Sequence, residues 1–517
     1  MIGSSEQDFS IVAVDKFIQA TRDSGYKGTS SAVAELVDNS LQAGATAIHV
    51  RITASEDEEH PIVLKVIDDG SGMDSRTLRT ALRFGGSTRF NDRVGLGRYG
   101  MGLPNSSLSQ AQRVTVHTWG PERSDVLRSY LDLDEIAAGV MTEVPRPEEV
   151  VRPSFINGSA SGTAVTWSRC DRLDNRRIST LVRKLLLSLG RRFRHFLWGG
   201  VKITVNGDPV QPIDPLFLHP DARFNGATEY ASFEREIPAA PGDASVTGIV
   251  RVTFSELPVN EWSKLPNKLK RERGIAKGAG VSIVRGGREV DYGWFFLSGK
   301  RRENYDDWWR CEIQFDPVLD EAFGITHTKQ QIRPSAHVVE ALSTDMENTA
   351  RALNSRARKA HLSVKVAERL SSSEGRAAEK DSLLTPLPTK PRPRDKPVLE
   401  SLKKDLSTPR DSGDGAPDGV EYRIVPKSLK DTCFFNYARD EGRLVLVLNP
   451  DHQFYKLVYK QLIESDEPRD VAMRTSIDLL LLAAARAEAL LDGTEALKVA
   501  EQLRADWSDT LATFLAR

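Results

Sequence analysis

The sequence predicts an α/β sandwich in its N-terminal part, where helices cover one face of a sheet. Helical and strand patterns are interleaved along this region instead of forming separate blocks, which is typical of a helix layer on a sheet. Strands are expected in alternating or β-branched runs at 46–52, 62–67, 114–119, 163–167 and 201–205. Apolar residues recur with helical spacing in the three expected helices, at 32–42, 78–84 and 178–196.

The first helix has the clearest boundaries. Thr29, Ser30 and Ser31 are residue types that cap a helix N-terminus, and Gly44 stands where a helix is expected to end. Between them the apolar residues fall on one helical face. We therefore expect a helix at 32–42 that packs on the sheet through that face.

The length of 517 residues suggests about three domains. The predicted division is a first α/β domain at residues 1–220, a second α/β domain at 221–368, a disordered linker at 369–420 and a C-terminal module at 421–517. The linker is rich in Pro, Ser, Lys, Asp and Gly, so it has too little apolar surface to fold.

Two of these regions have element patterns of their own. The second α/β domain is expected to contain a long helix from 337 to about 365, and strands at 246–254, 281–285 and 309–315. The C-terminal module is expected to be mainly helical, with a strand at 444–448 and helices at 474–491 and 494–514.

The composition excludes several classes of protein. The 71 basic and 72 acidic residues nearly cancel, so overall charge gives no reason to expect binding to nucleic acid or a membrane surface. Cys170, Cys311 and Cys433 lack the spacing of metal ligands and fit a reducing compartment. No stretch has the length and apolar character of a signal core or a membrane span. We expect a soluble cytoplasmic protein with no membrane partner.

The first motif with chemical content is Glu35-Leu-Val-Asp-Asn39, within the expected first helix. Residues four apart lie on one helical face, so Glu35 and Asn39 are neighbours. A carboxylate can accept a proton from the water that attacks a phosphate, and an amide oxygen is a suitable ligand for Mg²⁺. A solvated face of an ordinary amphipathic helix explains this motif equally well when it is taken alone.

The second motif is Asp68-Asp-Gly70-Ser-Gly72-Met73, which follows an apolar strand. Asp68 therefore stands at a strand end, where the glycines let the chain turn sharply and a ligand approach. A buried carboxylate there can accept a hydrogen bond from an exocyclic amine such as that of adenine. The alternative is a simple Asp-Gly turn.

The third motif, at 95–102, contains a Gly-x-Gly-x-x-Gly pattern. It does not follow the first strand of a dinucleotide-binding unit, and the chain lacks the catalytic loop of a protein kinase. Glycine N–H groups before a helix can bind phosphate, and a short helix is expected at 104–110. The polar residues at 84–93 are suited to a mobile lid.

These motifs, in this order and with Ser161-Gly162-Thr163 after them, closely resemble the nucleotide motifs of the GHKL ATPases. This superfamily includes gyrase B, the heat-shock chaperone of ninety kilodaltons, histidine kinases, MutL and the microrchidia (MORC) proteins. The resemblance covers about residues 10–210. It implies a Bergerat-type ATP-binding fold for the first domain and a transducer-like second domain.

The resemblance also implies roles for individual residues. Glu35 would be the general base, Asn39 would bind Mg²⁺, Asp68 would contact adenine, and Thr163 would support that contact. Gln42 stands where MutL-like sequences carry Asp. The other residues that the motifs assign to ATP binding are Gly70, Gly72, Met73, Ser87, Gly97, Arg98, Tyr99, Gly100, Met101 and Gly102.

Two stretches bear on the branch of the superfamily. Residues 84–103 look more like MORC or chaperone lids than like MutL, whose Gly-Glu-Ala signature they lack. Residues 323–330 resemble the MORC segment that delivers a lysine to the γ-phosphate, which makes Lys329 a catalytic candidate; a surface lysine in a polar turn is the alternative.

About 30 residues precede Glu35, too few for the histidine-bearing hairpin of a histidine kinase, so hydrolysis is favoured over phosphotransfer.

Two basic stretches are candidate partner sites. Residues 191–195 are interpreted as the charged side of a helix, and residues 264–277 as a basic loop that could contact duplex DNA. The basic side chains of that loop are Lys268, Lys270, Arg271 and Arg273.

The resemblance implies an ATP-dependent homodimer that acts as a DNA-associated clamp of the MORC type. A chaperone-like ATPase acting on protein clients is the alternative. A binding module without hydrolysis is disfavoured by the intact Glu35.

Overall fold

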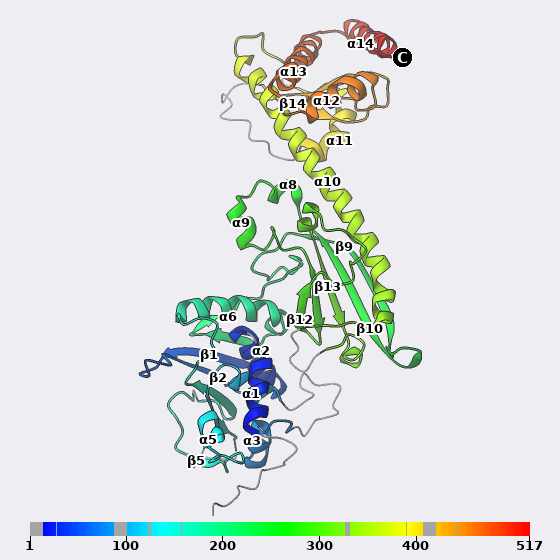
Figure 1. The fold of residues 1–517 in the computed structure, drawn as a ribbon. Coiled ribbons are helices and arrows are strands. Elements are labelled where there is room, and N and C mark those ends of the chain that lie inside the picture. Colours follow the sequence, from blue (N-terminus) through cyan, green and yellow to red (C-terminus); the bar gives the residue numbers. More distant parts are fainter. Residues whose placement is uncertain are drawn as a thin grey trace, which may run out of the picture. The chain divides into compact units, whose positions relative to one another are not determined.

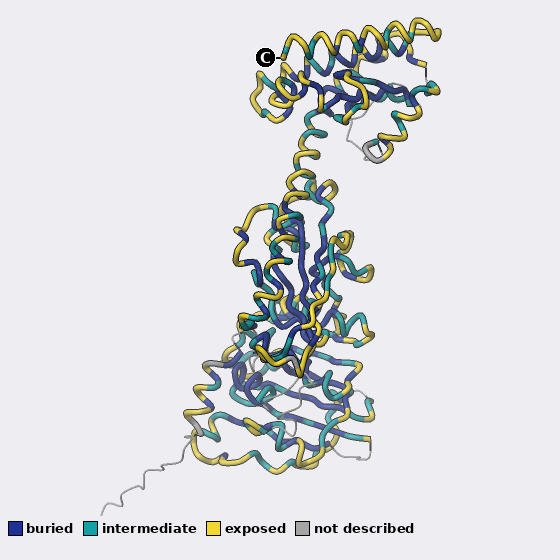
Figure 2. Tube along the Cα trace, turned by 90° about the vertical axis from the view of Figure 1, so that its right-hand side faces the viewer, coloured by how far each residue is buried: buried dark blue, intermediate teal, exposed yellow. Residues whose placement is uncertain are grey.

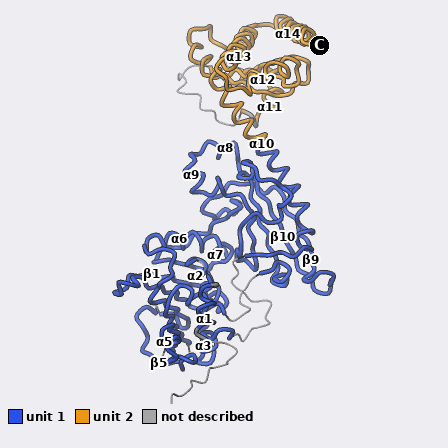
Figure 3. The backbone as a smooth tube through the Cα atoms, in the orientation of Figure 1, with its two compact units in different colours: residues 1–357 blue, residues 358–517 orange. Residues whose placement is uncertain are grey.

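The computed structural model describes residues 14–26, 28–86, 101–121, 126–156, 158–325, 331–388, 390–406, 420–440 and 442–516. The chain forms two compact units, an N-terminal unit of residues 1–357 and a C-terminal unit of residues 358–517 (Figure 3). Figure 2 shows that buried residues are concentrated in the interior of each unit.

The N-terminal unit begins with a mixed sheet of eight described strands in the order β5-β4-β3-β6-β2-β1-β7-β8. Neighbouring strands are antiparallel except β1 and β7, which are parallel. The strands are β1 Ala47–Ala54, β2 Ile62–Asp68, β3 Arg113–Trp119, β4 Val126–Asp132, β5 Glu148–Val150, β6 Gly162–Ser168, β7 Lys202–Val205 and β8 Asp208–Pro209. All five strands expected in this region are present, whereas β4, β5 and β8 were not predicted.

Helices cover one face of this sheet, which confirms the predicted α/β sandwich (Figure 1). The apolar face of α2 packs with residues of α6 and with the sheet in a single core, since Val33, Leu36, Leu64 and Leu185 belong to one buried cluster. The helices are α1 Val14–Ser24, α2 Thr29–Gln42, α3 Ser75–Leu82, α4 Gly102–Leu108, α5 Leu133–Ala137, α6 Ile178–Arg192 and α7 Arg194–Trp198.

Helix α2 begins earlier than the sequence predicts. Its N-cap residue is Gly28, in an extended conformation, and the helix starts at Thr29, so the prediction that Thr29 to Ser31 cap the helix is wrong. The Thr29 hydroxyl instead donates to Gln110 Oε1 at 3.0 Å, next to α4. The helix ends as predicted, because Gly44 has a φ of 75° that a glycine adopts without strain.

The second part of the N-terminal unit is a sheet of five described strands in the order β12-β11-β13-β10-β9. The strands are β9 Thr228–Ala240, β10 Asp243–Glu256, β11 Val281–Arg285, β12 Arg288–Gly293 and β13 Trp309–Phe315. The expected β10, β11 and β13 are confirmed. Strand β9 escaped prediction because, as an edge strand, most of its residues are exposed and carry no apolar run.

Short helices connect the strands of this sheet. They are α8 Val259–Trp262, α9 Asn267–Glu272, and the 3₁₀-helices η1 Asn304–Trp308 and η2 Pro317–Leu319. Helix α9 lies within the basic stretch at 264–277, so the expectation of a loop there is wrong for its central part.

Helix α10, Ala336–Asp381, contributes to both units and extends well beyond its predicted end near 365. Its last turns are ordered by packing in the C-terminal unit. Leu370 belongs to the core of that unit, the Ser373 hydroxyl donates to Asp478 Oδ2 at 2.6 Å, and Glu374 accepts from the Ile424 N–H at 2.8 Å. Composition alone does not reveal these contacts, which come from distant segments.

The C-terminal unit contains a three-stranded sheet in the order β14-β16-β15. The prediction of a mainly helical module included one of these strands, at 444–448, and missed the other two. The described elements of this unit are α11 Asp395–Leu406, β14 Glu421–Pro426, β15 Phe435–Asp440, β16 Arg443–Leu448, the π-helix η3 Tyr455–Tyr459, α12 Lys460–Glu464, α13 Pro468–Ala489 and α14 Thr494–Leu515. Helix α11 corrects the predicted disordered linker at 369–420, because Leu402 is buried against Val425, Val445 and Val447.

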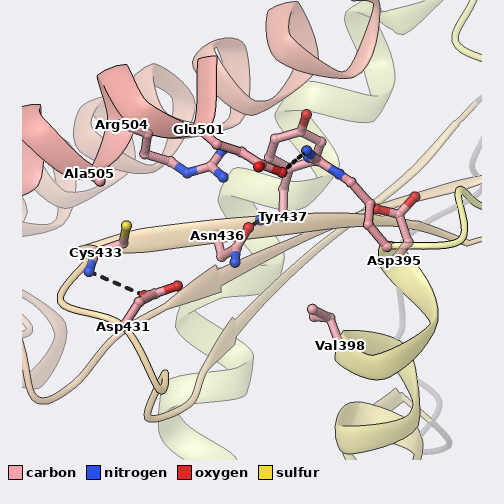
Figure 4. Close-up of a pocket in the computed structure, with 10 residues that line it drawn as sticks. Asp395, Val398, Asp431, Cys433, Asn436, Tyr437, Glu501, Arg504 and Ala505 are labelled. Carbon is pink, nitrogen blue, oxygen red and sulfur yellow. Dashed lines mark hydrogen bonds and ion pairs between the residues drawn. The ribbon is translucent and has the colours of Figure 1, made fainter. Parts of the chain in front are cut away.

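A polar cavity of about 340 Å³ lies in the C-terminal unit, between α11, β15 and α14 (Figure 4). Its charged groups are largely satisfied by one another: Arg394 pairs with Glu501, and Asp431 accepts from the Cys433 N–H at 3.2 Å. Burial raises the pKa of the Cys433 thiol, which keeps that thiol neutral. The three cysteines of the chain are all buried and unbridged, as expected from their spacing.

Candidate nucleotide site

Helix α2 carries the first motif into the core of the sandwich. Glu35 is only 3% exposed, and Asn39, one turn later, is half-buried. A Cβ atom at Gly102, the first residue of α4, would lie well within 3.0 Å of Glu35 Oε1. The absence of a side chain at Gly102 therefore lets the end of the third motif contact the carboxylate of the first.

Tyr26 is a neighbour of Glu35 that the sequence analysis did not single out. The Tyr26 side chain is buried and hydrogen-bonds to the Glu35 carboxylate. Burial raises the pKa of Tyr26 far above its ordinary value, and the negative charge of Glu35 raises that pKa further. Its backbone oxygen accepts from Gln110 Nε2 at 3.0 Å, which anchors the residue beside α4. Tyr26 precedes the first motif and carried no pattern that would have revealed it.

The second motif reaches the same helix through Asp68. Asp68 Oδ2 accepts from the Ser40 hydroxyl at 2.8 Å, and Ser40 directly follows Asn39 on α2. Asp68 Oδ1 accepts from the N–H groups of Gly70 at 3.0 Å and of Thr163 at 3.1 Å. The structure therefore brings Asp68 and Thr163 together, as expected, although the contact uses the backbone of Thr163.

The two acids of the second motif have opposite environments. Burial raises the pKa of Asp68, and its three hydrogen bonds offset that effect only in part. Burial also raises the pKa of Asp69, but hydrogen bonds from Ala47 and Thr46 outweigh it and leave that pKa below its ordinary value. Asp69 fastens the turn after β2 to the start of β1, whereas Asp68 faces the interior.

The glycine turn of the second motif is required by close packing. Gly72 has a φ of 70°, and a Cβ atom there would lie well within 3.0 Å of the Trp119 carbonyl oxygen at the end of β3. The Met73 N–H donates to Thr118 Oγ1 at 2.8 Å, and the Met73 side chain packs against the core. This turn therefore joins the ends of β2 and β3 on the side of the sheet where Asp68 lies.

Several predicted site residues lie outside the described residues. They are Ser87, Gly97, Arg98, Tyr99, Gly100 and the downstream candidate Lys329. Of the third motif, Met101 and Gly102 are described, at the start of α4.

The described residues contain no cluster of three or more His, Cys, Asp or Glu side chains that could hold a metal ion. A single half-buried amide, Asn39, fits Mg²⁺, because this ion commonly binds through one or two protein oxygens together with substrate phosphates and water.

The basic stretch at 191–195 is not a solvated helix face. Arg194 is completely buried against the second sheet of the N-terminal unit, where it donates to Ser282 Oγ at 2.9 Å and pairs with Glu289 and Glu312. Arg191 pairs with the same Glu289 at 2.8 Å. These arginines join α6 and α7 to the second sheet.

The second basic stretch, around α9, is more accessible. Lys268 and Arg271 are exposed. Lys270 donates to the Ser263 carbonyl at 2.8 Å, and the Arg273 guanidinium lies 5.1 Å from the centre of the Phe224 ring. Lys270 and Arg273 are therefore already engaged in local structure, and the exposed Lys268 forms a 4.0 Å ion pair with Glu272 on the same helix.

The fold and the meeting of three motifs at α2 define a nucleotide-binding α/β sandwich. Residues 26–163 match the family model of the histidine kinase-, DNA gyrase B-, and HSP90-like ATPases. This stretch runs from Tyr26 beside Glu35 to Thr163 beside Asp68. The chain therefore carries an ATPase domain of the GHKL class, a class whose members bind ATP, and the resemblance read from the motifs is confirmed.

Distant relatives of the chain belong to two branches of this class. Protein MICRORCHIDIA 5 of Arabidopsis thaliana is 36% identical over 96 residues, which are 18% of this chain and 13% of that protein. Human ATPase MORC2 is 38% identical over 78 residues, 15% of this chain and 8% of that protein. The DNA mismatch repair protein MutL of Shewanella loihica is 24% identical over 257 residues, 47% of this chain and 38% of that protein.

In each case the match spans well under half of the relative's length.

Among the described helices, none combines the length and apolar character needed to cross a membrane.

Proposed function

We propose that this chain hydrolyses ATP with the help of Mg²⁺, and that Glu35 and Asn39 carry the phosphate chemistry. Glu35 would accept a proton from the water that attacks the γ-phosphate, and the Asn39 oxygen would hold the metal. Mg²⁺ would supply positive charge to the phosphate oxygens. The observation that carries this proposal is the packing of Gly102 against Glu35, because it brings the end of the glycine-rich motif next to the proposed base.

We infer that Asp68 binds adenine. A carboxylate offers about four acceptor positions, and described donors occupy three of them, from Ser40, Gly70 and Thr163. The remaining position suits the exocyclic amine of the base. Lys329 is proposed, on sequence resemblance alone, to reach the γ-phosphate from the second domain.

The hydrolysis proposal is tested by Glu35→Ala. We expect turnover to fall by about 100-fold or more, the effect of removing a general base, while ATP affinity is retained. Turnover would be measured by phosphate release and affinity by calorimetric titration. Wild-type turnover in this variant would remove Glu35 from the mechanism.

A finer proposal is that the chain is a DNA-associated clamp that closes as a homodimer when ATP binds. The distant MORC and MutL relatives, and the exposed Lys268 and Arg271 of the basic stretch, support it. Duplex DNA should stimulate turnover, and a nonhydrolysable ATP analogue should double the mass measured by light scattering. Stimulation by an unfolded protein client instead of DNA would favour a chaperone-like function.

The role of α9 has its own test. Replacing Lys268 and Arg271 by Ala should reduce the salt dependence of DNA binding by up to two phosphate contacts, each worth about 0.9 in the log-log slope. A matched control replaces Arg176 and Lys202, which are exposed in the first domain. An unchanged slope in the α9 variant would exclude this helix from the DNA surface.

A further inference from the structure

Asp38 lies between the proposed base and the proposed metal ligand on α2, and it is held by the second domain. The Asp38 side chain is completely buried, and Asp38 Oδ2 lies 2.7 Å from Arg288 Nε. Arg288 is also buried and is the first residue of β12, directly after a two-glycine turn. A side chain of the second sheet therefore reaches the helix that carries Glu35 and Asn39.

The beginning of β12 is fixed to the first domain at two points. Arg288 holds α2, and its neighbour Glu289 accepts from Arg191 of α6 and Arg194 of α7. Helix α6 is itself tied to α2, because Arg192 donates to the Ser31 hydroxyl at 3.1 Å. Through these contacts, a displacement of β12 would also move α2.

The position of Asp38 on the helix makes this contact relevant to the site. Successive residues of an α-helix are separated by about 100° around its axis, so Asp38 lies about 60° from Glu35 and about 100° from Asn39. Holding Asp38 fixes the rotation of α2 about its axis. The same rotation sets the direction in which Glu35 and Asn39 point.

Stability is a weak explanation for this buried pair. Removing two charges from water costs free energy that their attraction often fails to offset, and apolar side chains of similar volume are commonly as stable or more stable. A pair of this kind is better suited to fixing one orientation of two elements. The buried Phe193 ring lies 5.8 Å from the Arg288 guanidinium.

Tyr26 connects this ion pair to the base. Its hydroxyl bonds to Glu35, and after burial and Glu35 the next influences on its pKa are the charges of Arg288, which lowers it, and Asp38, which raises it. All four of these side chains are buried: Glu35, Tyr26, Asp38 and Arg288.

We propose that Arg288 is a positioning residue through which the second α/β domain aligns Glu35 and Asn39 for hydrolysis, so that turnover depends on β12 being docked on α2. This inference rests on the proposed function of Glu35 and Asn39. In this arrangement the second domain influences the site through its contact with α2. A shift of β12 would slow catalysis while leaving the Gly70 and Thr163 donors of Asp68 in place.

The test replaces the ion pair by apolar residues, as Asp38→Leu with Arg288→Met. We expect kcat to fall by roughly 10- to 100-fold through misalignment, and half-maximal turnover to need more Mg²⁺. ATP binding without Mg²⁺ should change much less than kcat, because Asp68 keeps its donors Gly70 and Thr163. Thermal unfolding would verify that the variant is folded.

A matched control is available within the second domain. Lys300 forms a buried ion pair with Asp306 of η1, at 2.5 Å, and this contact is made within that domain. Lys300→Met with Asp306→Leu should leave kcat and the Mg²⁺ requirement within about twofold of wild type, since distant sites with no shared partners behave independently. An equal loss of turnover in this control would overturn the specific role of Arg288.

Conservative variants keep the inference testable if the apolar pair does not fold. Arg288→Lys should recover more turnover than Arg288→Gln, because it retains the charge facing Asp38. In a cycle with Asp38→Asn and Arg288→Gln, the losses in kcat should be strongly non-additive. Additive losses, or wild-type kcat and Mg²⁺ dependence in the apolar pair, would overturn the inference.

Glu35→Ala, measured in parallel, separates this inference from the function on which it rests. If that variant abolishes turnover while the apolar pair is as active as wild type, only the role of Arg288 fails. If Glu35→Ala is fully active, the proposed function and the inference both fail.

Discussion

The two ends of the candidate site are built differently. At the proposed adenine end, Asp68 takes its described hydrogen bonds from Ser40, Gly70 and Thr163, all within the first sandwich. At the proposed phosphate end, Glu35 bonds to Tyr26 and lies about one helical turn from Asp38, which pairs with Arg288 of the second sheet. The difference indicates that nucleotide binding and turnover can be perturbed separately.

The largest expected effect breaks the phosphate end alone. Gly102→Ala would place a Cβ atom against Glu35 Oε1 and displace the proposed base, so kcat should fall by about 100-fold. ATP affinity should fall less than kcat, because Asp68 and its donors are untouched and Gly102 is one of several glycines assigned to ATP binding. Gly375→Ala, in α10, is a control, since a Cβ atom there has no neighbour within 4 Å. A larger loss of affinity than of kcat would contradict the separation of the two ends.

The reverse separation is expected for Asp68→Asn. The amide oxygen can still accept from Gly70 and Thr163, and its NH₂ group can donate to Ser40, but the charged acceptor for adenine is lost. A hydrogen bond to a charged group contributes about 1.5–3 kcal/mol, so ATP affinity should fall by roughly 10- to 150-fold. Calorimetric titration would measure this change. Unaltered affinity would remove Asp68 from adenine binding.

The difference in stability between Asp68→Asn and wild type is also expected to depend on pH. Burial raises the pKa of Asp68 above its ordinary value of 3.8, so the folded protein holds this proton more tightly than the unfolded chain. The contribution of the group is most favourable below pH 3.8 and is lost as pH rises through the folded-state pKa.

Asp68→Asn should therefore be at least as stable as wild type at pH 7, with its relative advantage shrinking in acid. Denaturant unfolding at several pH values would measure this. A stability deficit that grows from pH 4 to pH 7 would contradict the sign.

The smallest expected effect concerns the link between the two ends. Ser40→Ala removes one of the donors to Asp68 while leaving Asn39 and Glu35 in place, so both stability and ATP affinity should fall by about 1 kcal/mol. Ser476→Ala, which removes an exposed hydroxyl on α13, is a suitable control. A loss in kcat without a loss in affinity would show that Ser40 acts on the phosphate end.

Local sequence patterns predicted much of the fold because they report burial along one element. The apolar periodicity of α2 and the β-branched runs of β1, β2, β11 and β13 identified those elements directly. Edge strand β9 and the helix α11 were missed, since one has no apolar run and the other lies in a stretch whose composition resembles a linker. Strand β9 is held by pairing with the next strand, β10, whereas α11 is held by contacts with strands further along the chain.

The sequence by itself determined which chemical groups the site contains and in what order, because the spacing of Glu35 and Asn39 follows from helix geometry and the glycine motifs restrict the backbone. Tertiary structure alone decided that Tyr26 contacts Glu35, that Ser40 contacts Asp68, and that Arg288 pairs with Asp38. It also placed Arg194 of one basic stretch in buried ion pairs with the second sheet, and left Lys268 and Arg271 of the other stretch exposed. The physical reason is that a charge has no fixed role until its burial and its partner are known, and both are set by residues distant in the chain.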